Sequence, residues 1–271
     1  MKTLTFYAED KLKLGVKTGQ GILDVDKALS KIPAADAVPT SVEELLQGGA
    51  SALASLEGYV RLVLDRNDAT LFHAEESLKL GPCVTKPEKI ICVGLNYRKH
   101  AEESNMPIPE TPILFNKFNN TLAAHEEDVL LPHNSTQVDY EAELVIVIGK
   151  KAKQVSKADA LEYVYGYCNA DDLSARDLQF RTHQWLLGKS CDGFSPLGPY
   201  LVSADEIGDP NDLGIRCYVN GELRQDSNTS DMIFHCDEIV SYISDHMTLE
   251  PGDIILTGTP AGVVLGYPEA E

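Results

Sequence analysis

The stretch VDYEAELVIVIGKK, residues 138–151, combines a feature that decides the fold with one that points to chemistry. Residues 144–148 are all apolar, which is typical of a strand buried on both faces of a sheet. Glu141 and Glu143 stand at the start of this strand. Because side chains two residues apart on a strand point the same way, the two carboxylates are predicted to share one face.

Two glutamates aimed at one point beside an apolar strand repel each other and lose hydration. Both effects raise the pKa of the carboxyl groups unless a cation lies nearby. Ca²⁺, Mg²⁺ and Mn²⁺ are the hard cations that prefer oxygen ligands. The pair alone leaves a simpler alternative open, in which the strand begins in solvent and both glutamates are surface residues.

Composition narrows the classes of partner. The chain has 271 residues, a hydrophobic share of 43%, a charged share of 24%, a net charge of −19 and a pI near 4.7. This acidity argues against nucleic acid and against anionic membranes as partners. The start of the chain shows no signal peptide, and no apolar run approaches a membrane span. Six scattered cysteines form no CxxC pair, so a reducing cytoplasm is the predicted location.

The order of turn signals predicts two parts. Residues 1–80 contain short strands with Gly-rich turns and then a helix. Thr40 is predicted to cap this helix, and Glu43 would close a capping box. Gly48–Gly49 are predicted to end this turn, and a helical run follows to about residue 66. The segment LGPCVTKPEK (residues 80–89) is typical of a linker. It precedes a second part over residues 85–271.

The second part is predicted to be a β-dominated α+β domain rather than a doubly wound sheet. Helical periodicity marks residues 157–168 and 236–247, and Asn220-Gly221 is a hairpin turn signal. No Gly-rich nucleotide motif is present, so a nucleotide cofactor is not expected. The predicted strands are IICVGLNY, TPILFNKF, VDYEAELVIVIG, GPYLVSADEI, LGIRCYVNGELRQ and GDIILTGTP.

Further chemistry-bearing residues surround these strands. The segment GYCNADDLSARDLQ carries Asp171, Asp172 and Asp177, which a capped helix beginning near Leu173 would also explain. In GLNYRKHAEESN, a helix would make His100 and the glutamate three residues later neighbours, and the carboxylate would orient the imidazole and raise its basicity. An ordinary surface contact is the alternative there.

The blocks VGLNYRKHAEE, DYEAELVIVIGK, DDLSARDLQ, GKSCDGFSPLGP, VNGELRQ, SDMIF and LEPGDIILTGTPAGV occur in an order that strongly resembles the fumarylacetoacetate hydrolase superfamily. The resemblance runs from about residue 85 to the end. It is closest to the smaller prokaryotic-type branch. Members of that branch include acylpyruvate hydrolases, oxaloacetate decarboxylases or tautomerases, and 2-hydroxyhepta-2,4-diene-1,7-dioate isomerases.

This resemblance implies a distorted β-roll catalytic domain behind a small N-terminal α/β domain, usually in a homodimer. It also implies Mg²⁺ or Mn²⁺, with Ca²⁺ possible in a crystal, held by Glu141, Glu143 and Asp172. The family lysine falls on Lys189, for which a surface lysine is the alternative. The family's mobile dyad falls on His100–Glu103.

The expected reaction is metal-dependent hydrolysis of a C–C bond in a 2-oxo or 1,3-diketo acid, such as an acylpyruvate, through an enolate. The alternatives are an oxaloacetate decarboxylase or tautomerase, a dienedioate isomerase, and a catalytically silent binding protein. Gln179 is expected to hydrogen-bond the substrate. Thr259 is expected to hold its carboxylate, or else to be a plain turn residue. Lys117 and His125 are weaker pocket candidates, and Arg176 is expected to form a structural ion pair with Asp177.

Two departures from the family pattern matter. The segment KIICVGLNY offers no carboxylate for the fourth metal ligand of the enzyme that names the family, which disfavours fumarylacetoacetate itself as substrate. The chain ends at GVVLGYPEAE, where relatives usually continue through two more strands, so either a truncation or a different chain end is expected, which affects the final sheet but not the ligands. The usual GVG also reads GVV here, at residues 262–264, beside the predicted substrate site.

Overall fold

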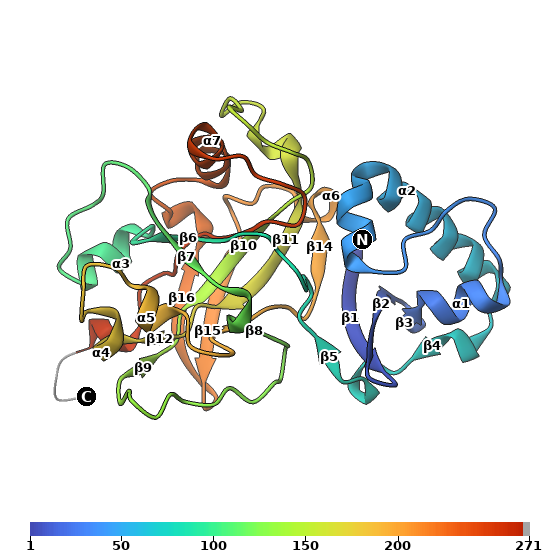
Figure 1. Cartoon of the computed structure of the whole chain (residues 1–271), viewed down its shortest axis with the longest axis horizontal. Coiled ribbons are helices and arrows are strands. Elements are labelled where there is room, and N and C mark those ends of the chain that lie inside the picture. Colours follow the sequence, from blue (N-terminus) through green and yellow to red (C-terminus); the bar gives the residue numbers. More distant parts are fainter. Residues whose placement is uncertain (268–271) are drawn as a thin grey trace.

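One mixed sheet runs through both lobes of the molecule in the computed structural model, which describes residues 1–267 (Figure 1). The strand order is β4-β3-β2-β1-β14-β11-β10-β17-β6-β7, with β5 also paired to β1. The predicted α+β class, dominated by β-structure, is confirmed. The strands of this sheet are β1 (Lys2–Ala8), β2 (Lys11–Thr18), β3 (Gly21–Asp24), β4 (Phe72–His73), β5 (Leu80–Gly81), β6 (Ile90–Gly94), β7 (Ile113–Lys117), β10 (Ala142–Ile148), β11 (Val164–Asp171), β14 (Leu201–Ser203) and β17 (Ile254–Leu256).

Short strand pairs and helices surround the sheet. The pairs are β8 (Leu122–Ala123) with β13 (Ser195–Pro196), β9 (Val138–Asp139) with β12 (Ser174–Ala175), and β15 (Gly214–Val219) with β16 (Glu222–Asn228). The helices are α1 (Val25–Lys31), α2 (Val42–Arg66), α3 (Arg98–Glu103), α4 (Arg176–Gln179), α5 (Leu186–Lys189), α6 (Ala204–Ile207) and α7 (Cys236–His246). Asn220 and Gly221 both have positive φ between β15 and β16, so the predicted hairpin turn is confirmed.

Strand β10 explains why the opening stretch is apolar at every position. Val145 and Val147 pack in a cluster with residues of α2, while Leu144, Ile146 and Ile148 pack in a second cluster with residues of α7. Both faces of the strand are therefore buried, as the sequence predicts. Burying each such side chain stabilises the fold by about 1.5–3 kcal/mol.

Helix α2 starts one residue later than its sequence signals suggest. Ser41, not Thr40, is the N-cap, and its hydroxyl accepts a hydrogen bond from the amide of Glu44 at 3.1 Å. Glu44, not Glu43, reaches back to the amide before the cap. At Gly49, where a turn end is predicted, the helix kinks with φ 53° and then continues. Only glycine adopts this conformation cheaply.

The prediction of a helix over residues 157–168 is wrong for most of that segment. A short 3₁₀ turn, Ala160–Tyr163, is followed directly by β11. Val164, Tyr165 and Tyr167 are β-branched or aromatic and favour strands, and β11 pairs with both β10 and β14. These two ladders decide the structure against the weak helical period.

The two lobes share the sheet where β1 pairs with β14. The chain leaves the N-terminal lobe after β5 and enters β6 at Ile90, so most of the linker predicted over residues 80–88 lies between these strands, while its first two residues form β5. The domain boundary itself stays a prediction. Within residues 1–267 no helix is both long and apolar enough to traverse a bilayer. The expectation for the chain end concerns the segment GVVLGYPEAE, whose last residues, 268–271, lie outside the described part.

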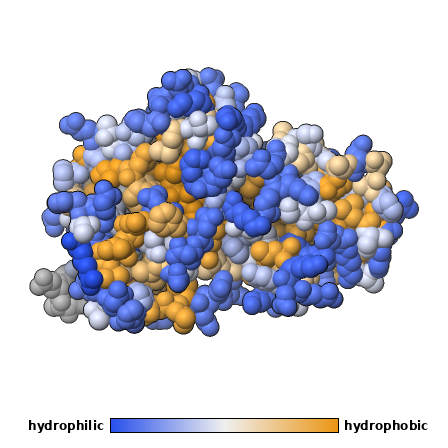
Figure 2. Space-filling model, viewed as in Figure 1, coloured by the Kyte–Doolittle hydropathy of each residue, from blue (hydrophilic) through white to orange (hydrophobic). Residues whose placement is uncertain are grey.

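Apolar side chains are not spread evenly over the surface. Figure 2 shows larger hydrophobic areas on the bigger lobe than on the N-terminal one. The exposed large hydrophobic residues of the bigger lobe include Phe118, Leu130, Leu131, Phe180 and Leu187.

Candidate active site

Three buried carboxylates meet where β10 begins and β11 ends. Glu141 directly precedes β10, Glu143 lies on it, and Asp172 directly follows β11. Antiparallel pairing of the two strands brings them together, and the amide of Asp172 donates to the carbonyl of Glu141 at 2.9 Å. The residues are only 5%, 3% and 0% exposed, yet one carboxylate oxygen from each lies within 4.8 Å of the others. The predicted convergence is thus present in the structure, while the role as metal ligands stays a prediction.

Two buried lysines contact this cluster. Lys189 Nζ lies 2.7 Å from Glu141 Oε2 and 2.9 Å from Asp172 Oδ2. Lys117 Nζ lies 2.5 Å from Asp172 Oδ1 and also donates to the carbonyl of Phe194. Lys189 therefore lies where the resemblance puts it, and Lys117, only a weak candidate in the sequence, is part of the same cluster.

The carboxylates experience different fields. Burial alone would raise the pKa of Glu141, but Lys189 and Arg176 outweigh it and lower this pKa to about 2. Burial, together with Asp172 and Glu141, raises the pKa of Glu143 well above its usual value. Asp172 and Glu141 also raise the pKa of Lys189 against the effect of burial, so its ammonium group stays charged. The donor set is all oxygen with one under-neutralised carboxylate, which suits a hard divalent cation.

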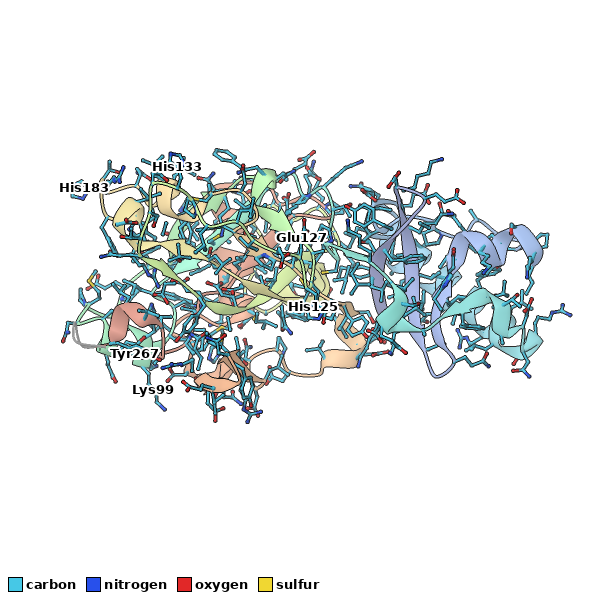
Figure 3. All side chains as sticks on the ribbon, turned by 90° about the horizontal axis from the view of Figure 1, so that it is seen from below. Lys99, His125, Glu127, His133, His183 and Tyr267 are labelled. Atoms are coloured by element: carbon cyan, nitrogen blue, oxygen red, sulfur yellow. The ribbon has the colours of Figure 1, made fainter. Side chains whose placement is uncertain are left out.

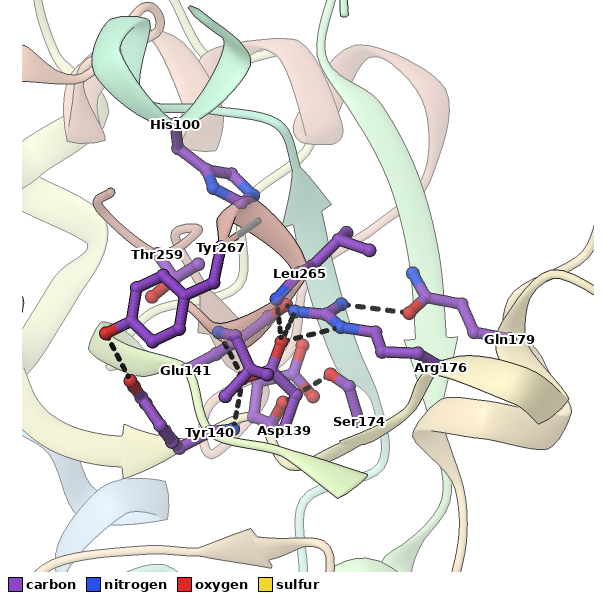
Figure 4. A network of polar contacts seen from close by, with 12 residues as sticks. His100, Asp139, Tyr140, Glu141, Ser174, Arg176, Gln179, Thr259, Leu265 and Tyr267 are labelled. Carbon is purple, nitrogen blue, oxygen red and sulfur yellow. Dashed lines mark hydrogen bonds and ion pairs between the residues drawn. The ribbon is translucent and has the colours of Figure 1, made fainter. Parts of the chain in front are cut away.

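Arg176 belongs to the site and does not form the ion pair expected from the sequence. Its guanidinium lies 2.7 Å from both Asp139 Oδ2 and Glu141 Oε1 (Figure 4). Asp177 instead contacts the hydroxyl of Ser135. Neighbouring residues on a short helix such as α4 point in different directions, which explains the error.

The predicted His–Glu pair forms on α3. His100 Nδ1 lies 2.8 Å from Glu103 Oε1, and the amide of Gly262 donates to Glu103 Oε2 at 2.9 Å. His100 is buried, and in Figure 4 its imidazole points from α3 toward the region of Glu141. Because the carboxylate occupies Nδ1, Nε2 is the nitrogen left to exchange a proton with a ligand.

A cavity of about 250 Å³ unites these groups. Its walls contain most of the residues singled out in the sequence, namely His100, Glu103, Glu141, Glu143, Gln179, Lys189 and Thr259, together with Arg176. Asp172 does not line the cavity and is fully buried behind it. The apolar part of the wall consists of Val93, Leu95, Met106, Phe115, Phe180, Trp185 and Leu265.

The two predicted substrate-binding residues differ in what they can offer. Gln179 Oε1 accepts from Arg176 at 2.9 Å, which leaves its NH₂ group as a donor. The hydroxyl of Thr259 donates to the carbonyl of Ala142 at 3.0 Å and accepts from Gln225 at 2.8 Å. Its proton is therefore engaged within the protein, so its hydroxyl has to change partner before it can donate to a substrate carboxylate.

His125 does not belong to this cavity. It lines a separate cavity of about 170 Å³ with Asn169, Gly198 and Cys217. Figure 3 shows it on the side of the larger lobe near the N-terminal lobe, whereas Tyr267 lies toward the opposite end. No local sequence signal separates His125 from Lys117, because the contact of Lys117 with Asp172 spans 55 positions.

Comparison with known sequences places the chain among enzymes of one family. The family model for the fumarylacetoacetate (FAA) hydrolase C-terminal region matches residues 89–270. The chain is 43% identical over 269 residues to the mitochondrial oxaloacetate tautomerase fahd2 of Xenopus laevis, covering 97% of this chain and 81% of that protein. It is 41% identical over 256 residues to the human mitochondrial oxaloacetate tautomerase FAHD2A, covering 92% and 77%.

Solved structures agree with these relatives. A putative HpcE protein from Mycobacterium smegmatis has a TM-score of 0.80 and 36% identity, covering 98% of this chain and 89% of that one. Maleylpyruvate hydrolase from Sphingobium sp. SYK-6, solved with manganese(II) and pyruvate, has a TM-score of 0.76 and 30% identity, covering 97% and 90%. With the fold, the buried carboxylates and these likenesses in agreement, this chain belongs to the fumarylacetoacetate hydrolase family.

Proposed function

We propose that this chain is a metal-dependent tautomerase of small 2-oxo acids, with oxaloacetate as the favoured substrate. The observation that carries the proposal is the cavity in which the His100–Glu103 pair and two of the three clustered carboxylates, Glu141 and Glu143, face one ligand space. The named relatives at 41–43% identity support the tautomerase alternative better than the C–C hydrolysis that the sequence put first.

Tautomerisation moves one proton between C3 and the 2-oxygen of the substrate and breaks no C–C bond. His100 Nε2 would take or return the proton at C3, and Glu103 would hold the ring by Nδ1 and stabilise the imidazolium. When bound by Glu141, Glu143 and Asp172, Mg²⁺ or Mn²⁺ would supply Lewis-acid stabilisation of negative charge on the 2-oxygen.

Three further groups would bind and orient the acid. Lys189 keeps its charge beside the cluster and would attract the substrate's negative oxygen. Arg176 and the NH₂ group of Gln179 line the same cavity and would donate to a carboxylate. The apolar side chains opposite, such as Trp185 and Phe180, would exclude water from the reacting atoms.

A second candidate is hydrolysis of an acylpyruvate-like C–C bond. The likeness to maleylpyruvate hydrolase favours it at 30% identity, and the same His100 would then deprotonate a water instead of C3. The two reactions differ in whether a water must fit between His100 and the substrate.

A substrate panel with Mn²⁺ separates these functions. Turnover of enol-oxaloacetate would be measured as loss of enol absorbance. Decarboxylation of keto-oxaloacetate would be measured as release of pyruvate, and hydrolysis of an acylpyruvate as loss of diketone absorbance. We expect fast enol–keto conversion that EDTA abolishes and Mn²⁺ or Mg²⁺ restores. Absence of any acceleration over the uncatalysed rate, with Mn²⁺ binding verified by calorimetry, would refute the proposal and favour a silent binding protein.

The assembly and the compartment remain predictions. A homodimer is what the family resemblance implies, and light scattering of the purified chain tests it. The predicted cytoplasmic location contrasts with the word mitochondrial in the names of the two tautomerases, and fractionation of cells that express the chain distinguishes the two.

A further inference from the structure

Asp139 collects five hydrogen bonds although it is not among the predicted site residues. Its Oδ1 accepts from the amides of Tyr140 and Val264, both at 2.9 Å. Its Oδ2 accepts from the amide of Leu265 at 3.1 Å and from Arg176 Nε and Nη2 at 2.9 and 2.7 Å. The side chain is only 1% exposed. A buried carboxylate with so many donors fixes the groups around it, and Figure 4 shows this network.

The backbone that Asp139 holds also reaches the His–Glu pair. We call residues 262–267 the strap; it includes the 3₁₀ turn Val264–Gly266. The amide of Gly262 donates to Glu103 Oε2 at 2.9 Å. At Gly266 a side chain would displace Glu103, since a Cβ would lie 2.7 Å from the Glu103 carboxyl group. The strap therefore contacts Arg176 through Asp139 on one side and His100 through Glu103 on the other.

A third contact fixes the strap to the start of β10. The hydroxyl of Tyr140 donates to the carbonyl of Gly262 at 2.9 Å and lies 3.2 Å from the hydroxyl of Tyr267 (Figure 4). Leu265 in the middle of the strap forms part of the cavity wall. The strap is thus bound at both ends and in the middle, and it borders the space that a ligand would occupy.

We propose that the strap is a positioning element for both sides of the cavity, with Asp139 and Gly266 as its positioning residues. By binding Asp139, the strap keeps the guanidinium of Arg176 shared between Asp139 and Glu141. Arg176 therefore does not occupy the Glu141 carboxylate completely. Because Gly266 has no side chain, Glu103 can keep its hydrogen bond with the amide of Gly262 and orient His100. The kinetic part of this inference rests on the proposed function, whereas its structural part does not.

Asp139→Asn tests the first side, because it removes the charge and keeps the shape. The Arg176 guanidinium is then expected to turn to Glu141. We expect a loss of about 10- to 100-fold in kcat/KM, mostly as a higher KM, and a similar weakening of Mn²⁺ binding. Amide hydrogen exchange in residues 262–267 should become faster. Asp177→Asn is the matched control, since Asp177 lies next to Arg176 but contacts Ser135 and Thr136 instead.

Gly266→Ala tests the second side and gives an answer even if Asp139→Asn does not fold. The new methyl group should displace the end of the Glu103 side chain, which is flexible enough to move. We expect kcat to fall about 10-fold or more with KM nearly unchanged, and the pH dependence of kcat to shift, because His100 loses its partner. Gly214→Ala is the control, since its Cβ would meet open space.

The outcomes separate the inference from the proposed function. Strap exchange and Mn²⁺ affinity need no substrate, so they decide the structural part even if the wild type turns over nothing in the panel. Unchanged strap exchange and unchanged Mn²⁺ affinity in Asp139→Asn would overturn the inference. If the wild type is active, a Gly266→Ala variant whose kcat stays within twofold of wild type would also overturn the inference.

Discussion

The N-terminal lobe and the cavity of the larger lobe are built on opposite principles. The interior of the lobe is apolar, and its buried charge is Asp24, which caps α1. Around the cavity the structure buries four carboxylates and three cations, namely Asp139, Glu141, Glu143, Asp172, Lys117, Arg176 and Lys189. Burying apolar surface stabilises a fold, whereas burying charge costs stability unless each charge is paired. The difference shows which region is built for stability and which for chemistry.

The largest effect is expected where the charge is least compensated. Glu143→Gln keeps the size of the side chain and its contact with the amide of Gly258, but it removes one negative charge from beside Glu141 and Asp172. The metal-free protein should become slightly more stable because repulsion falls. Metal-dependent activity and the rise in Tm on adding Mn²⁺ should be lost.

Differential scanning fluorimetry and calorimetry with Mn²⁺ measure this change. Asp171→Asn is the control, because Asp171 accepts from the amide of Glu141 but is not part of the carboxylate cluster. Undiminished Mn²⁺ binding by the Glu143 variant would remove it from the set of ligands.

His100→Ala is expected to have the next largest effect, confined to the chemical step. Removing a positioned general base lowers kcat by about 10²- to 10⁴-fold. Mn²⁺ affinity should stay close to wild type, because His100 forms its hydrogen bond with Glu103 and not with one of the three carboxylates. Enol–keto kinetics and calorimetry on the same sample check both parts; a full kcat would place the base on another residue.

In the N-terminal lobe the expected loss is of stability and not of function. Leu56→Ala on α2 should lower the free energy of unfolding by about 2–5 kcal/mol, since it leaves a cavity in the apolar core. Leu62 on the same helix is 38% exposed, against 0% for Leu56, so Leu62→Ala is the control. Denaturant unfolding measures both, and kcat of the folded variant should be unchanged. A large fall in kcat without loss of stability would break the contrast between the regions.

The smallest expected effect concerns the cap of α2. Ser41→Ala should cost about 1 kcal/mol, because the amide of Glu44 loses its acceptor. Thr40→Ala should cost less, since its hydroxyl only contacts the exposed Glu44 carboxylate. Comparison of Tm values tests this order, and the reverse order would return the cap to Thr40.

Local patterns in the sequence predict the rigid parts of the molecule well. The unbroken apolar run of β10, the Asn220-Gly221 turn and helix α7 follow from periodicity and turn chemistry within a few residues. The family resemblance supplied Glu141, Glu143 and Asp172, which the structure brings together.

The errors at β11 and at Arg176 have one physical origin, which is contact between distant segments. Residues 164–171 form a strand because two other strands pair with them, and this pairing, unlike their local strand preference, cannot be seen in the sequence. The sequence predicts an ion pair of Arg176 with its neighbour Asp177, but its partner Asp139 lies 37 positions away. The strap likewise matters through Glu103, which is 159 positions from Gly262.

Strand β10 is buried by residues of both lobes, and this affects whether the larger lobe can fold without the smaller one. One face of the strand that carries Glu143 belongs to an apolar cluster that also contains residues of α2, and β1 extends the same sheet at β14. The family model covers residues 89–270, but a fragment cut to those limits would lose the residues of α2 from the cluster that contains Val145 and Val147. Removal of the small lobe is therefore expected to destabilise the rest of the chain, because the two lobes share this cluster and one sheet.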